Sequence, residues 1–254
     1  LNTIPHHFIA SHSIQDEVNA AVFEQYALTR SNIIFENSNA VVMVGGTGLY
    51  IKSFCEGLDA IPAIDAAVRN SIIDLYRTNG LQWLQAQVAL NDPLYWAQCE
   101  QQNPQRLMRA LEVKLGAGDS ILAFQNKPKP IRPFKIVKIG IQMPMEQLYY
   151  RINQRVLNMF DVGLEKEVHD LQPHKGLNAL QTVGYKEWIP YFEGQISKAK
   201  VLENIQQNTR HYAKRQMTWF KRDKRIKWLA GPPRLERGTS VLETDVLPLK
   251  LQAQ

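Results

Sequence analysis

The chain has 254 residues, of which 44% are hydrophobic and 21% are charged, a composition typical of a globular protein with a sizeable core. It holds no uncharged apolar run of about 18 residues, which excludes a membrane-spanning helix, and residues 1–4 lack the pattern of a secretory signal. Cys55 and Cys99 lie far apart without metal-ligand spacing, so we expect reduced, half-buried thiols in a cytoplasmic protein.

The net charge of +6 is concentrated in one segment. Between Arg210 and Lys227, eight lysines and arginines stand against one acid, Asp223. The other residues are together close to neutral. A local cationic strip indicates a surface that binds phosphates, whereas evenly spread positive charge would indicate only solubility.

The first elements in chain order predict an α/β core. Ser13, with Asp16 three residues later, resembles an N-cap and predicts a helix to about residue 34. The apolar run 40–44 predicts a strand buried on both faces, as in a parallel sheet. Gly45-Gly46-Thr47-Gly48 then connects this strand to a helix.

The middle of the chain shows only helical patterns, at 65–76, 81–90 and 105–115. We interpret residues 62–129 as a helical insertion in an α/β core of residues 1–61 and 130–254. The rest of the core is predicted as strands at 134–142 and 225–229 and helices at 145–160, 164–171, 185–192 and 197–222. The tail after Gly231 lacks periodicity and is expected to pack poorly.

The glycine turn allows two interpretations. Gly45 and Gly46 let a ligand approach the backbone, the following helix offers free N–H groups to an anion, and Thr47 adds a hydroxyl at the N-cap. A plain strand–helix connection has the same appearance, and the turn alone does not decide between them.

Two arginines of the insertion also allow two interpretations. Arg106 and Arg109 leave one face of their helix, while apolar residues such as Leu107 pack on the other. From the residues alone, a solvated face with Arg109 bonded to Glu112 is favoured over a binding role.

The segment 209–220 carries the strongest signal. Arg210, Lys214 and Lys221 share a cationic stripe, which we interpret as phosphate ligands. Aromatic residues such as Trp219 could stack on an unpaired base, but we interpret them as anchors of the helix. Lys186 is either a further phosphate ligand or a surface lysine paired with Glu187.

A metal site at the adjacent His6 and His7 is not expected. Neighbouring side chains of an extended segment point in opposite directions, and no third ligand lies nearby.

Five motifs occur in a specific order along the chain. They are Pro5-His6-His7, Val44-Gly45-Gly46-Thr47-Gly48-Leu49-Tyr50, Arg106-Leu107-Met108-Arg109-Ala110-Leu111-Glu112-Val113, Gly184-Tyr185-Lys186-Glu187, and Thr209-Arg210 with Ala213-Lys214-Arg215-Gln216 and Thr218-Trp219-Phe220. Over about residues 5 to 230, the chain resembles the tRNA dimethylallyltransferase (tRNA isopentenyltransferase) family. The resemblance implies a P-loop NTPase-like α/β core with a helical insertion. It also implies transfer of a dimethylallyl group to the exocyclic amine of the adenosine 3′ to the anticodon.

The resemblance further implies roles for particular residues. Thr47 would be catalytic and, with Arg69, would contact the target region of the tRNA, while Gly45, Gly46 and Lys186 would bind the diphosphate. The insertion would clamp the anticodon arm through Gln105, Arg106, Leu107, Met108 and Arg109. The RNA backbone would be held by Arg210, His211, Lys214 and Arg215. We then expect Thr47, Lys186 and the Arg210 helix to line one shared tunnel.

The implied partners are the tRNA anticodon stem-loop and dimethylallyl diphosphate, with Mg²⁺ as cofactor, no membrane, and a monomeric protein. The family's Gly-rich phosphate loop ending in Gly-Lys-Ser/Thr, and its aspartate general base, do not occur in the printed sequence, and Leu1 comes after both. We therefore expect the chain as printed to be inactive, with the Mg²⁺ ligands also outside it. Two alternatives stay open: an adenylate isopentenyltransferase that uses free AMP, ADP or ATP, and a non-catalytic RNA-binding fragment.

Overall fold

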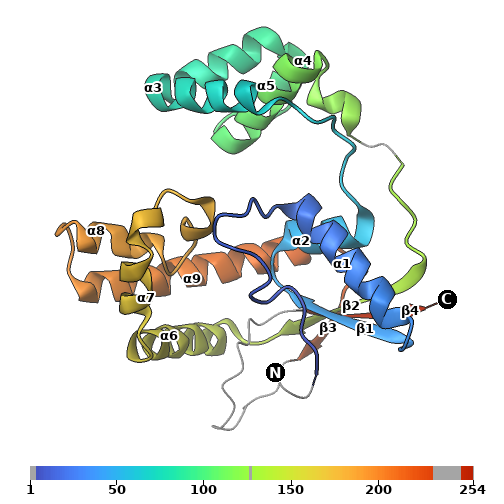
Figure 1. The fold of residues 1–254 in the computed structure, drawn as a ribbon, viewed down its shortest axis with the longest axis vertical. Coiled ribbons are helices and arrows are strands. Elements are labelled where there is room, and N and C mark those ends of the chain that lie inside the picture. Colours follow the sequence, from blue (N-terminus) through green and yellow to red (C-terminus); the bar gives the residue numbers. More distant parts are fainter. Residues whose placement is uncertain (1–3, 126–127, 231–246, 254) are drawn as a thin grey trace. The chain divides into compact units, whose positions relative to one another are not determined.

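The computed structural model describes residues 4–125, 128–230 and 247–253. The chain forms two compact units (Figure 1). Residues 1–55 and 132–254 make the first, called the core unit, and residues 56–131 make the second, called the helical unit. The sequence places the insertion at 62–129, a few residues inside the limits of the helical unit.

The core unit contains a mixed sheet with the strand order β1-β4-β2-β3. Its strands are β1 (Ala40–Gly45), β2 (Phe134–Gln142), β3 (Lys227–Ala230) and β4 (Leu247–Ala253). Strands β2 and β3 are parallel, and β4 is antiparallel to both β1 and β2. Strands β1, β2 and β3 therefore run in the same direction, which confirms the predicted parallel sheet for these three.

Two expectations about the sheet are wrong. Val41 is buried, but Val42 and Val44 on the other face of β1 are 62% and 60% exposed. The apolar run therefore forms a strand that is buried on one face only. The β propensity of its residues favours a strand but does not determine how many faces of that strand are covered.

The tail was expected to pack poorly, yet it supplies β4, an inner strand whose two edges both pair with neighbours. Backbone pairing on both edges holds such a strand without any side-chain periodicity. Residues 231–246 of the tail lie outside the described part of the chain.

Helices α1 (Ala20–Phe35) and α2 (Gly48–Glu56) pack against the sheet through a core that includes Val41, Phe54 and Phe134. The start of α1 differs from the prediction. Asn19 caps the helix by accepting from the N–H groups of Ala21 and Val22. The backbone N–H of Ser13 instead donates to Asp16 within a turn, so this pair satisfies its polar groups locally and does not start a helix.

The remaining helices of the core unit are α6 (Met145–Asp161), α7 (Leu164–Asp170), α8 (Ile189–Phe192) and α9 (Lys198–Phe220). Short 3₁₀ turns connect them: η2 (Gln172–His174), η3 (Asn178–Leu180) and η4 (Lys186–Trp188). The helix predicted at 185–192 is thus a 3₁₀ turn followed by one short α-helix. Their shared apolar core includes the fully buried Trp188 and Val201.

Arg132 fixes the end of α2 within the core unit. Its guanidinium donates to the carbonyl oxygens of Phe54 at 2.7 Å and Ser53 at 2.8 Å, and pairs with Glu24 of α1 at 2.6 Å. Carbonyls in the last turn of a helix have no partner within the helix. Arg132 therefore caps α2 and ties it to α1.

The helical unit consists of α3 (Ala66–Asn91), α4 (Pro93–Trp96), α5 (Pro104–Ala117) and the 3₁₀ turn η1 (Ile121–Phe124). The separation predicted between the helices at 65–76 and 81–90 is present as a break inside α3, where Gly80 has a φ of +74°. The unit has its own apolar core, which includes Leu84, Val88, Leu107 and Leu111.

Among the described residues, no helix is both long enough and apolar enough to cross a bilayer. Cys55 is buried and Cys99 is partly exposed, so only the second fits the expected half-buried thiol. Burial raises the pKa of the Cys99 thiol.

Candidate functional site

The glycine turn joins β1 to α2 in the core unit. Strand β1 ends at Gly45 and α2 begins at Gly48. The carbonyl of Thr47 accepts the first helical hydrogen bond, from the N–H of Ile51 at 3.1 Å. Thr47 therefore occupies the predicted N-cap position, where the N–H groups of the first helical turn lack helical partners.

Helix α9 packs directly against this turn. The side-chain amide of Gln216 donates to the carbonyl oxygen of Gly46 at 3.0 Å. A Cβ atom on Gly48 would lie 2.4 Å from the indole ring of Trp219, a distance that real Cβ atoms do not reach. Position 48 must therefore be glycine for Trp219 to lie where it does.

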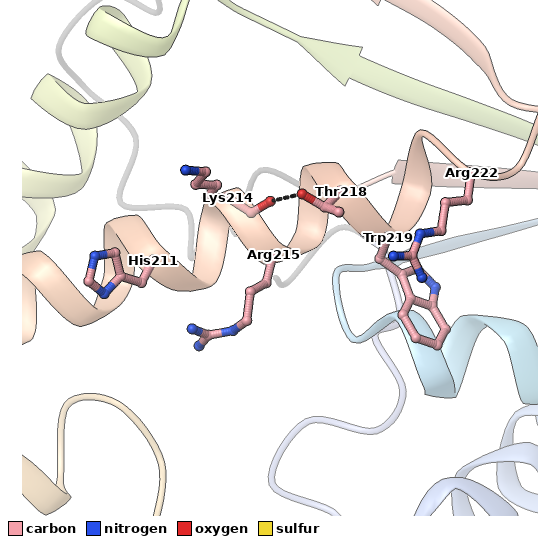
Figure 2. Close-up of a pocket in the computed structure, with 6 residues that line it drawn as sticks. All are labelled: His211, Lys214, Arg215, Thr218, Trp219 and Arg222. Carbon is pink, nitrogen blue, oxygen red and sulfur yellow. Dashed lines mark hydrogen bonds between the residues drawn. The ribbon is translucent and has the colours of Figure 1, made fainter. Parts of the chain in front are cut away.

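A pocket of about 450 Å³ lies along the C-terminal half of α9. Its lining residues are His211, Lys214, Arg215, Thr218, Trp219 and Arg222 (Figure 2). Figure 2 shows the side chains of Arg215 and Trp219 extending on the same side of α9. Because Trp219 both lines the pocket and covers Gly48, the pocket adjoins the glycine turn.

Within the part of the chain that the structure describes, the pocket cations Lys214, Arg215 and Arg222 make no ion pair. The Arg215 guanidinium lies over the ring of Tyr212, 5.7 Å from its centre. Ammonium and guanidinium groups gathered without counter-charges attract anions, and phosphates are the strongest biological candidates.

Asp223, the single acid between Arg210 and Lys227, binds two cations outside the pocket. Its carboxylate accepts from Lys138 of β2 at 2.6 Å and from Arg225 at 2.8 Å. These hydrogen bonds, with that from Arg225 the largest influence, hold the pKa of Asp223 well below its usual range. The ionised Asp223 thus binds the end of α9 to the sheet and does not neutralise the pocket.

Arg210 is held away from the pocket lining. Its guanidinium donates to the side-chain oxygen of Asn153 on α6 at 2.7 Å. His211, Lys214 and Arg215, which the sequence groups with Arg210, do line the pocket. The structure thus brings three of these four residues together.

Lys186 lies in the 3₁₀ turn η4, beside a different part of α9. The alternative of an ion pair with Glu187 is wrong, because Glu187 is buried and accepts from the backbone N–H of Gly184 at 2.8 Å and from Asn208 at 2.7 Å. Asn208 lies eight residues before Gln216, about 12 Å along the helix. Neither Thr47 nor Lys186 is among the residues that line the described pocket, so the expected shared tunnel is not present there.

Helix α5 of the helical unit carries the arginine pair. Arg106 is exposed and pairs with the exposed Glu100 at 3.2 Å. Arg109 pairs with Glu112 at 2.6 Å, and the Glu112 side chain is only 8% exposed. The ion pair expected from the sequence is therefore present, and it leaves the Arg109 guanidinium partly exposed.

Leu107 requires a correction. It stands among the expected tRNA contacts, but it is fully buried in the core of the helical unit. Its role is to hold α5 so that its neighbours face outward: Gln105 and Arg106 are exposed and Met108 is half-buried, and Arg69 on α3 is exposed as well.

The described residues offer no metal site. No group of three or more His, Cys, Asp or Glu side chains among them could hold a metal ion. Mg²⁺ prefers oxygen ligands from carboxylates and phosphates, and the donor set for it is not found in the described part of the chain.

Gln216, Thr218, Trp219 and Arg222 were not assigned a binding role from the sequence. The spacing of Gln216 and Trp219, three residues apart, does place them on one face of a helix. Nothing in that spacing says that this face meets a turn 170 residues earlier in the chain.

A mixed α/β core with a glycine turn at the end of a strand, next to a cationic pocket on a helix, is the arrangement expected of a protein that binds phosphorylated ligands. Comparison with known proteins is more specific. The family model of IPP transferase matches residues 1–223, and the chain belongs to this family.

Similar proteins support the assignment of the chain to this family. A tRNA dimethylallyltransferase of Christiangramia forsetii is 42% identical over 223 residues, which cover 88% of this chain and 74% of the relative. A tRNA dimethylallyltransferase of Flavobacterium johnsoniae is 41% identical, and the match covers 90% of this chain and 76% of the relative. The crystal structure of a tRNA isopentenylpyrophosphate transferase from Bacillus halodurans aligns with a TM-score of 0.56 at 27% identity, covering 90% of this chain and 72% of the other.

The fold is shared more widely. A eukaryotic dimethylallyltransferase acting on tRNA aligns with a TM-score of 0.65 over 90% of this chain and 60% of that one, at 18% identity. The P-loop-like α/β fold expected from the sequence is thus confirmed.

Proposed function

We propose that this protein transfers a dimethylallyl group from dimethylallyl diphosphate to N6 of the adenosine 3′ to the anticodon in tRNA. The observation that carries the proposal is the pocket of α9, whose lysine and arginines make no ion pair with the described residues and which adjoins the glycine turn through Trp219. Membership in the IPP transferase family, and relatives named tRNA dimethylallyltransferase, support it.

The reaction explains why phosphate-binding groups matter. The allylic C–O bond breaks, diphosphate leaves with the bonding electrons, N6 of the adenine forms the new bond to carbon, and a base takes one proton from N6. An aromatic amine is a weak nucleophile, so positive charge develops on the allylic carbon while negative charge grows on diphosphate. Groups that hold this departing charge lower the barrier.

Each group of residues has a place in the proposal. Thr47 contacts the reacting adenosine, and the backbone of Gly45 and Gly46 with Lys186 binds diphosphate. His211, Lys214 and Arg215 hold the RNA backbone. Arg210 contacts the RNA backbone only at the edge of the surface formed by His211, Lys214 and Arg215, since Asn153 already binds its guanidinium.

The helical unit holds the anticodon arm through the exposed side chains of α5, namely Gln105, Arg106, Met108 and part of Arg109, together with Arg69 of α3. A target base inside a folded loop must leave its stack before a protein can modify it. Contacts with the anticodon arm beyond the target base stabilise the conformation in which that base has left its stack.

A divalent metal, Mg²⁺, would neutralise diphosphate when bound. The described residues hold no ligand set for it. We also propose a monomer that acts in the cytoplasm, where tRNA is used.

The test is prenyl transfer measured with the complete protein, including any residues that precede Leu1. Labelled dimethylallyl diphosphate is incubated with unmodified tRNA, with a tRNA that has another base at the target position, and with AMP. Label on the unmodified tRNA alone is the expected result. Label on AMP would instead favour the adenylate isopentenyltransferase, and tRNA binding without transfer would favour a non-catalytic RNA-binding protein.

A further inference from the structure

Two uncharged side chains of α9 contact the glycine turn. Gln216 donates from its side-chain amide to the carbonyl oxygen of Gly46 at 3.0 Å. Trp219, one helical turn later, lies with its indole ring against Gly48, where a Cβ would come within 2.4 Å. The two contacts are made to the residues immediately before and after Thr47 in the sequence.

The contact from Gln216 fixes the orientation of a peptide group. The carbonyl of Gly46 and the N–H of Thr47 belong to the same peptide plane and point in opposite directions when the peptide is trans. A hydrogen bond that draws the Gly46 carbonyl toward α9 therefore directs the Thr47 N–H away from α9. It also sets the position of the Thr47 Cα and of its side chain.

The turn needs such an external support. Glycine can adopt many backbone conformations, so Gly45 and Gly46 leave the orientation of the next peptide weakly determined. Trp219 limits the freedom of the turn at the other end, because its ring occupies the space beside Gly48. With both contacts present, Thr47 has one orientation relative to α9.

The same helix carries the pocket cations. Arg215 precedes Gln216 in sequence, and Trp219 lines the pocket itself. Side chains on one helix keep constant spacing, so a contact from Gln216 to the turn also fixes the distance between Thr47 and the cationic side chains.

We propose that Gln216 is a positioning residue for the transfer reaction, which acts by holding the Gly46–Thr47 peptide so that Thr47 is aligned with the phosphate-binding side chains of α9. Trp219 assists by holding Gly48. The inference rests on the proposed function, since it assumes that Thr47 contacts the reacting adenosine. It assigns Gln216 no contact with either substrate.

The test compares Gln216→Met with Gln206→Met in the complete protein. Methionine has nearly the volume of glutamine and a good helix propensity, but it cannot donate the hydrogen bond. Gln206 is the matched control: it lies on the same helix, is partly buried and also donates to a backbone carbonyl, that of Asn153 at 3.4 Å. It has no contact with the turn.

We expect Gln216→Met to lower kcat for prenyl transfer by roughly tenfold to a hundredfold, the range in which small misplacements of reacting groups fall. KM for tRNA and the melting temperature should stay close to those of Gln206→Met. In a Thr47→Ala background the effect of Gln216→Met should shrink to less than about threefold, because residues that act through one another are not additive.

Three outcomes overturn the inference while the wild type still transfers the prenyl group. The first is a kcat of Gln216→Met within twofold of wild type. The second is an equal loss of kcat in both methionine variants, and the third is a loss that remains in full in the Thr47→Ala background, since either means that Gln216 does not act through Thr47. Failure of the wild type to modify tRNA would overturn the proposed function instead.

Discussion

The carboxylate of Asp223 accepts a hydrogen bond from the ammonium group of Lys138 at 2.6 Å, and both side chains are largely buried, at 21% and 10% exposure. Asp223 also accepts from the Arg225 guanidinium at 2.8 Å and 2.9 Å. Lys138 lies on β2 and Asp223 follows α9, so this cluster fixes the cationic helix to the sheet.

Replacing Asp223 with Asn should lower the free energy of unfolding by about 2 kcal/mol, because it removes the charge on the carboxylate that accepts from the largely buried Lys138 and from Arg225. Urea denaturation measures this. The control is Glu203→Gln, which removes the exposed pair with Lys200 and should change stability by less than about 0.5 kcal/mol. Equal effects of the two variants would contradict the structural role of Asp223.

The same residue predicts how stability depends on pH. The pKa of Asp223 is lowered in the folded protein, chiefly by the hydrogen bond from Arg225, so its contribution is fully present above the unfolded pKa of about 3.9. It is lost as the pH falls below that value toward the folded pKa. The stability difference between wild type and Asp223→Asn should therefore be constant from pH 7 to about 5 and shrink below about pH 4. A difference that changes near pH 6 would point to another group.

Gly48→Ala should disturb the turn, since the new Cβ would lie 2.4 Å from the Trp219 ring. Overpacking of this kind costs about 1–3 kcal/mol, and the displaced indole should lower prenyl transfer as well. Thermal unfolding and the transfer assay measure the two effects. Gly176→Ala is the control, because nothing lies within 4 Å of its Cβ position and it should leave both unchanged.

The two arginines of α5 should behave differently when replaced by alanine. Arg106→Ala removes an exposed pair and should raise the KM for tRNA while the melting temperature stays within about 1–2 °C of wild type. Arg109→Ala also leaves the buried Glu112 carboxylate unpaired and should destabilise the protein by about 1–3 kcal/mol. The double variant Arg109→Ala/Glu112→Gln should recover part of that stability without recovering the KM. Unchanged KM in Arg106→Ala would argue against a tRNA contact by this helix.

Binding of tRNA should weaken strongly with salt, because cationic side chains displace counterions from phosphates. Lys214→Ala and Arg215→Ala should each reduce the slope of log K against log salt concentration by about 1. Filter binding across a salt series measures the slope. Lys166→Ala, which removes an exposed lysine paired with Asp170 on α7, should leave it unchanged. If all three variants behave alike, the pocket cations are not the phosphate ligands.

Local patterns predicted most of the helices and three of the strands. Asn103 caps α5, Gly118 ends it with a φ of +83°, and Gly80 breaks α3, all effects that operate within one or two turns. The start of α1 shows the limit of such signals, because Ser13 and Asn19 both have the chemistry of an N-cap. The strand at 247–253 had no local signal, because its place in the sheet depends on partners more than 100 residues away.

The sequence by itself determined the residue types of the site: a glycine turn, a cationic segment and an arginine pair, each recognisable because charge and backbone freedom belong to the residues themselves. Only the tertiary structure decided which of them act together. It placed Gln216 and Trp219 on the turn, bound Arg210 to Asn153, buried Leu107 and set Lys186 beside another part of α9. Helical spacing says which side chains share a face, but the partner of that face is fixed by packing between segments far apart in the chain.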